Sequence, residues 1–187
     1  MSNPGAADET PIQSTSELVD VLAQGCKPRD AWRIGTEHEK FGFIRPDSAT
    51  PAKAAYATPD YSPEGIEALL KALHKSEPDD WTSVLDKGNI IGLKGQGQAA
   101  GAAISLEPAG QFELSGAPLR TLHETAEELA NLFDSVRPLA RKLGIGFSPL
   151  GFHPTATRDA MPWMPKSRYA IMRDYMPKVG TMGLDMM

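Results

Sequence analysis

The feature that most constrains the fold is a hairpin signal at residues 104–115, where two short runs of alternating apolar and polar residues flank Pro108-Ala109-Gly110. Proline presets φ for the second position of a type I turn, and Gly110 can take the left-handed conformation that closes a three-residue loop. The stretch therefore predicts two antiparallel strands joined by a tight turn.

The length of this loop decides which side chains share a face. With three residues in the loop, Ser105 lies opposite Glu113, and Glu107 lies opposite Gln111. Period-two alternation then places both glutamates on one face, whereas a two-residue loop would separate them. Taken alone, the pair is more typical of solvated charges on the wet side of a hairpin.

A second pair of carboxylates, Glu37 and Glu39, lies upstream. Residues two apart on a strand point to the same side, and Phe41 and Phe43 follow on that side. This pattern indicates partial burial, which is costly for carboxylates unless positive charge compensates them. Mg²⁺ prefers hard oxygen ligands and commonly bridges carboxylates and phosphates, so the four glutamates predict a site for Mg²⁺ with a nucleotide. The alternative is neutralisation by Lys40, Arg33 and water.

Composition narrows the class of protein. The chain has 187 residues and a formal net charge of −5, without the basic footprint of nucleic-acid binders. No apolar run is long enough to span a bilayer. The first dozen residues contain Asp8 and Glu9 and fit neither a secretory signal nor a transit peptide, so the expected location is the cytoplasm. We interpret residues 1–13 as a mobile lead-in and residues 14–187 as the N-terminal portion of a single, incomplete domain.

Helix signals surround the strands. Capping boxes at Ser14 and at Thr121 predict helices that end near Gly25 and Gly144, and Ser62-Pro63 predicts another helix start. Ser167 is expected to cap a last helix that Pro177 ends.

Two arginines on that last helix, Arg168 and Arg173, are candidates for gripping a carboxylate through the guanidinium fork. From sequence alone, surface arginines on a solvated helix remain the alternative.

Four segments in this order resemble glutamate–cysteine ligases of the plant and proteobacterial type. They are GTEHEKFGF at 35–43, IIGLK at 90–94, ISLEPAGQFELSGAP at 104–118 and RYAIMRDYMPKVGTMGLDMM at 168–187. The resemblance covers the chain from about residue 33 to its last residue and matches the N-terminal part of such an enzyme.

The resemblance implies an α+β, glutamine-synthetase-like fold: a curved antiparallel sheet with helices outside, here incomplete. It implies ATP- and Mg²⁺-dependent joining of the glutamate γ-carboxylate to the amine of L-cysteine through a γ-glutamyl phosphate, the first step of glutathione synthesis. By motif, the implied metal ligands are Glu37, Glu39, Glu107 and Glu113, the implied catalytic residues are Arg168 and Arg173, and the implied ATP contacts are Lys40 and Lys94.

The implied partners are the small molecules L-glutamate, L-cysteine and ATP, with homo-oligomerisation left open. Two alternatives stay open as well: a γ-glutamyl ligase with another acceptor amine, and a non-catalytic fragment whose unfinished sheet pairs with a partner chain.

Overall fold

The computed structural model describes residues 10–46 and 56–186. Part of the predicted lead-in, residues 1–9, therefore lies outside the described residues. The helices and strands follow in the order α1 (Thr15–Ala23), β1 (Glu37–Ile44), α2 (Ile66–Ser76), β2 (Trp81–Asp86), β3 (Asn89–Gly95), β4 (Ala103–Leu106), β5 (Phe112–Ser115), α3 (Leu122–Lys142), β6 (Ile145–Ser148) and α4 (Ser167–Val179). Short 3₁₀ turns occupy Arg29–Ala31, Gly97–Ala99, Pro108–Gly110, Arg158–Ala160 and Gly183–Met186.

The strands form one six-stranded antiparallel sheet in the order β2-β3-β4-β5-β1-β6. Three consecutive hairpins build β2 to β5, and β1 inserts between β5 and β6. The α+β class is confirmed, and the sheet is consistent with an incomplete glutamine-synthetase-like fold.

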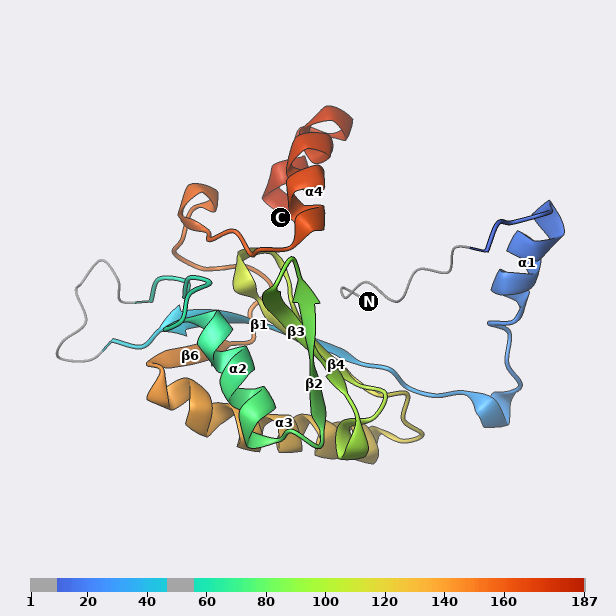
Figure 1. Cartoon of the computed structure of the whole chain (residues 1–187), viewed down its shortest axis with the longest axis horizontal. Helices are drawn as coiled ribbons and strands as arrows, with labels where there is room; N and C mark the ends of the chain where they lie inside the picture. Colours follow the sequence, from blue (N-terminus) through green and yellow to red (C-terminus); the bar gives the residue numbers. More distant parts are fainter. Residues whose placement is uncertain (1–9, 47–55, 187) are drawn as a thin grey trace.

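One face of the sheet is packed against α2 and α3 (Figure 1). The apolar stripe of α2 is fully buried, and α3 adds Leu132, Val136 and Ala140 to the same core. The strands contribute alternate residues to it: Leu93, Ile104, Leu106, Phe112 and Leu114. Burying such side chains contributes about 1.5–3 kcal/mol each, so this layer is the main source of stability.

The helix ends agree with the sequence in two cases. Ser14 accepts a hydrogen bond from the Glu17 backbone N–H, and Thr121 forms a complete capping box with Glu124. The apolar side of α1 is exposed, however, and the helix stands apart from the sheet in Figure 1.

Two other helix predictions were wrong. α2 begins at Ile66 with Gly65 as its N-cap, because residues 62–65 close a turn in which the Gly65 N–H donates to the Ser62 carbonyl. Ser167 is the first residue of α4 rather than its cap, and the helix continues through Pro177 to Val179.

The cap of α4 comes from a distant strand. The backbone N–H of Ser167 donates to an Asp86 carboxylate oxygen at 2.5 Å, and its hydroxyl donates to the other oxygen. The end of β2 thus fixes where α4 begins, beyond one end of the strands (Figure 1). No helix among the described residues is long and apolar enough to cross a membrane.

Candidate functional site

The site is organised around the β4–β5 hairpin. The backbone N–H of Glu107 donates to the Gln111 carbonyl at 2.8 Å, and the Gly110 N–H donates to the Glu107 carbonyl at 3.0 Å. The three-residue loop is confirmed. Ala109 has φ 61° and ψ 14°, the values of the third position of a type II turn, so the predicted type I turn was wrong.

Strand register brings the two glutamate pairs together. Glu113 on β5 lies directly opposite Ser105 on one side and Glu39 on the other, and Glu37 lies opposite Ser115. Directly paired residues point to the same face of a sheet. We call this the carboxylate face; its members are Glu37, Glu39, Ser105, Glu107, Glu113 and Ser115. It is the face opposite α2 and α3.

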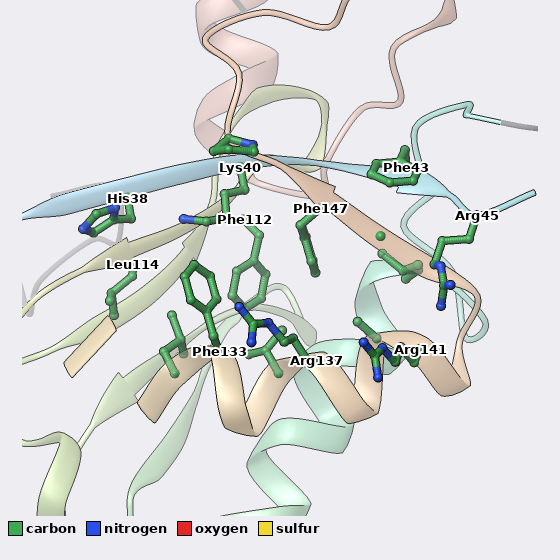
Figure 2. A pocket seen from close by; sticks show the side chains of 16 residues that line it. His38, Lys40, Phe43, Arg45, Phe112, Leu114, Phe133, Arg137, Arg141 and Phe147 are labelled. Atoms are coloured by element: carbon green, nitrogen blue, oxygen red, sulfur yellow. The ribbon is translucent and has the colours of Figure 1, made fainter. Parts of the chain in front are cut away.

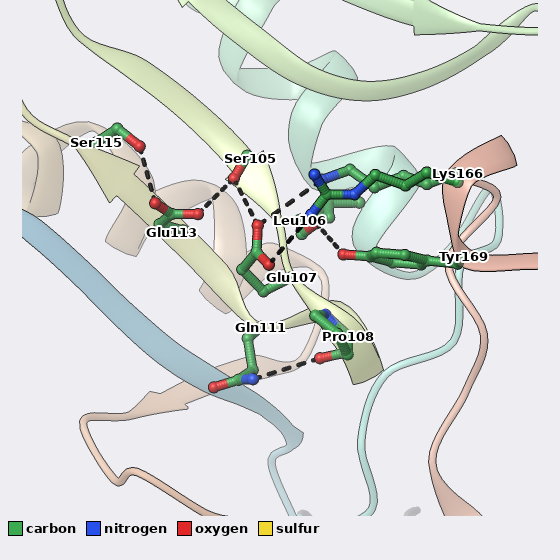
Figure 3. Close-up of polar contacts among 10 residues, drawn as sticks. Ser105, Leu106, Glu107, Pro108, Gln111, Glu113, Ser115, Lys166 and Tyr169 are labelled. Carbon is green, nitrogen blue, oxygen red and sulfur yellow. Dashed lines mark hydrogen bonds and ion pairs between the residues drawn. The ribbon is translucent and has the colours of Figure 1, made fainter. Parts of the chain in front are cut away.

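Glu113 is the buried centre of the carboxylate face, with 2% of its surface exposed. The Ser115 hydroxyl donates to one of its oxygens at 2.8 Å, and the Ser105 hydroxyl lies 2.6 Å from the other (Figure 3). Ser105 also lies 3.2 Å from a Glu107 oxygen, so one hydroxyl links the two carboxylates. Hydrogen bonds of this kind hold a buried carboxylate in place.

The electrostatics agree with this convergence. Although Glu39 is an exposed residue, partial loss of its hydration raises its pKa first, followed by the charges of Glu113, Glu107 and Glu37. Each neighbouring negative charge makes ionisation of Glu39 less favourable. All four glutamates therefore act on one region of the molecule.

Two cations lie beside Glu107. The Lys166 ammonium is 3.8 Å from one carboxylate oxygen, and the Arg168 guanidinium is 3.9 Å from the other (Figure 3). Lys166 is only 4% exposed, and burial lowers its pKa while Glu107 opposes that shift. Next to it, the Tyr169 hydroxyl donates to the Leu106 carbonyl at 3.0 Å.

Lys166 and Ser115 are candidate site residues that sequence reasoning missed, whereas Ser105 was already expected on the face of the glutamates. Ser115 follows Glu113 by two residues on β5, so the period-two pattern could have found it. Lys166 carries no comparable signal, because a tertiary contact alone brings the start of α4 to the hairpin.

The remaining predicted residues are distributed around the sheet. Lys94 is exposed on the carboxylate face, since it pairs with Ala103, which pairs with Ser115. Lys40 points to the opposite face, toward the Phe133 ring of α3. The Arg173 guanidinium lies 4.8 Å from the Trp163 ring, in a cavity of about 300 Å³ beside the hairpin turn. The structure thus brings Arg168 and Lys94 to the carboxylate face, but not Lys40 or Arg173.

The donor atoms fit Mg²⁺ in type, because carboxylate and hydroxyl oxygens suit hard cations. They do not yet fit in distance. Within residues 10–46 and 56–186, no three carboxylate, imidazole or thiol side chains lie close enough together to hold a metal ion. Glu37 and Glu39 are exposed, so the partial burial predicted for this pair was wrong.

Comparison with known proteins assigns the family. Residues 33–187 match the family described as Glutamate-cysteine ligase family 2 (GCS2). The chain belongs to this family.

The curated relatives that this chain matches are named glutamate–cysteine ligases, consistent with this family. The chain is 52% identical over 171 residues to the chloroplastic glutamate–cysteine ligase of Medicago truncatula. The matched region is 91% of this chain and 30% of that protein. It is 47% identical over 182 residues to chloroplastic glutamate–cysteine ligase A of Oryza sativa subsp. japonica, covering 97% and 34% respectively. The Arabidopsis thaliana enzyme is 49% identical over 171 residues. The chain therefore spans about a third of the length of these relatives.

The names of these family members also correct one prediction. All the curated relatives are chloroplastic enzymes, which contradicts the expected cytoplasmic location. That expectation rested on the absence of a leader-like pattern in the first dozen residues, and such an absence does not identify a compartment.

Proposed function

We propose that the carboxylate face is part of the active site of an ATP- and Mg²⁺-dependent ligase. The proposed reaction joins the γ-carboxylate of L-glutamate to the amine of L-cysteine through a γ-glutamyl phosphate, the first step of glutathione synthesis. The observation that carries the proposal is the pairing of Glu39 with Glu113 on adjacent strands, with Glu37 and Glu107 beside them.

The four glutamates are the proposed Mg²⁺ ligands. When bound, Mg²⁺ would neutralise phosphate oxygens and reduce the repulsion between two anionic reactants. Ser105 and Ser115 fix the Glu113 carboxylate, so the protein holds one ligand ready while Glu37 and Glu39 adjust from exposed positions.

The cations around this face have separate proposed tasks. Arg168 is 44% exposed and adjoins Glu107, which places its guanidinium where a substrate carboxylate can reach it. Lys166 is buried and holds Glu107 from the other side. Lys94 is the proposed phosphate contact because it is exposed on the same face as the glutamates.

Metal binding is the first test. We would titrate MgCl₂ calorimetrically into the chain in the presence of a non-hydrolysable ATP analogue. Glu113→Gln and Glu39→Gln should each weaken Mg²⁺ binding about tenfold or more, since each removes one charged ligand. Glu64→Gln is the matched control, because Glu64 is an exposed carboxylate in the turn before α2. Binding as tight in both site variants as in the unmodified chain would remove the proposed metal role.

The acceptor amine is tested separately. ADP release would be measured with L-glutamate and either L-cysteine or another small amine. The proposal expects cysteine to be preferred, as the names of the relatives imply. Equal rates with other amines would support a γ-glutamyl ligase of different specificity.

A further inference from the structure

A second cavity lies on the opposite side of the sheet from the carboxylate face. It has a volume of about 510 Å³ and lies between β1, β5, β6 and α3 (Figure 2). Its interior is lined by aliphatic and aromatic side chains, and Phe112 and Phe147 lie there with ring centroids 5.4 Å apart. Cavities of this size and character are typical of small-molecule sites.

The charged groups that line this cavity are all basic. They are Lys40, Arg45, Arg137 and Arg141; His38 also lines the cavity, and no Asp or Glu is among the described residues that do. This distribution is unexpected in a chain whose formal net charge is −5. The cations come from β1, from the segment that follows it and from α3, so they approach the cavity from two sides (Figure 2).

Two of these cations share one aromatic ring. The Lys40 ammonium lies 4.7 Å and the Arg137 guanidinium 5.1 Å from the centre of the Phe133 ring. Each contact is individually weak, because cation–π pairs contribute about 0.5–2 kcal/mol. Together they place two positive charges beside Phe133 in the lining of this cavity.

We propose that this cavity binds a small amphiphilic anion, with one acidic head group and an aromatic or acyl body. The head group would lie between Lys40 and Arg137, and the body would lie against Phe112 and Phe147. A polar ribose would not suit the apolar interior, so nucleotides are not the proposed class. The site is independent of the proposed ligase chemistry because the sheet separates the two.

The test compares two dyes that differ in charge. 8-Anilinonaphthalene-1-sulfonate carries a sulfonate, and N-phenyl-1-naphthylamine is its neutral counterpart. Fluorescence titration of the chain should give one binding site for the anionic dye, with an affinity about tenfold above that for the neutral dye, as expected for a charge-assisted contact. Lys40→Met and Arg137→Met should each remove most of that difference without weakening the neutral dye.

Lys142→Met is the matched control, since Lys142 is an exposed cation at the end of α3 that does not line the cavity. A second variant, Ala140→Met, fills the cavity from α3 and should weaken both dyes. Circular dichroism would establish that each variant is folded. The proposal is overturned if the two dyes bind equally, if the anionic dye binds at several sites, or if the control lowers its affinity as much as Lys40→Met does.

Discussion

The same strands build both faces of the sheet, but one face packs apolar side chains and the other gathers carboxylates. On β4 and β5, Ile104 and Leu114 pack beneath α2 and α3, whereas Ser105 and Glu113, one residue away, belong to the carboxylate face. Apolar burial on the packed face stabilises the fold, whereas repulsion between like charges on the carboxylate face destabilises it. A site of this kind is tolerated because the other side of the same strands stabilises them.

The largest expected difference between the two faces is in how much one substitution lowers the free energy of unfolding. Ile104→Ala should lower the free energy of unfolding by about 2–5 kcal/mol, since it removes a fully buried side chain and leaves a cavity. Ser105→Ala should cost about 1 kcal/mol, because it removes one hydroxyl that bridges Glu113 and Glu107. Urea unfolding of both variants measures the difference. Similar losses would mean that the carboxylate face contributes as much stability as the core.

Helix α3, which packs on the apolar face of the sheet, begins at the Thr121 capping box. Thr121→Ala should destabilise the chain by about 1 kcal/mol, because the Thr121 hydroxyl accepts the Glu124 N–H. The backbone N–H groups of Arg120 and Thr121 also lower the pKa of Glu124. A lowered carboxyl pKa stabilises the folded state above the unfolded pKa, and this stabilisation disappears as pH falls through the folded value.

Thermal melts of the Thr121→Ala variant across pH 2–7 check this prediction, with Thr157→Ala as a control at an exposed threonine that makes no cap hydrogen bond. A variant as stable as the unmodified chain would show that the capping box does not secure α3.

The hairpin turn joins β4 and β5, which contribute side chains to both faces, and its strain can be relieved. Ala109 has φ 61°, which costs an L-residue about 1 kcal/mol relative to glycine before the chain entropy of glycine is counted. Ala109→Gly should therefore stabilise the chain by a few tenths of a kcal/mol. Chemical denaturation measures this, and a clear loss of stability would contradict the type II turn.

The smallest expected effect is on the carboxylate face itself. Because the pKa of Glu39 is raised in the folded state, ionisation of Glu39 opposes folding. Its contribution is most favourable below the unfolded pKa and is lost as pH rises through the higher folded value. Glu39→Gln should therefore raise the melting temperature slightly at pH 8 and lose that advantage near pH 3. A variant that is less stable at pH 8 would show that the four charges are not in mutual repulsion.

Much of the site was predictable because its signals are local. The Pro108-Ala109-Gly110 loop and strict alternation put Glu107 and Glu113 on one face, and spacing alone put Glu37 and Glu39 together. The turn type was not predictable from the sequence, because proline suits the second position of type I and type II turns equally. Only the backbone conformation of Ala109 distinguishes the two types.

The sequence by itself determined which side chains share a face of each strand, since that follows from the two-residue period of an extended chain. It also determined two helix starts through the side-chain caps of Ser14 and Thr121, which act over three residues. Only the tertiary structure decided that β1 pairs with β5, so that Glu39 meets Glu113, and that Asp86 caps α4 and thereby places Lys166 beside Glu107. Those contacts join residues far apart in the chain, and no local preference encodes them.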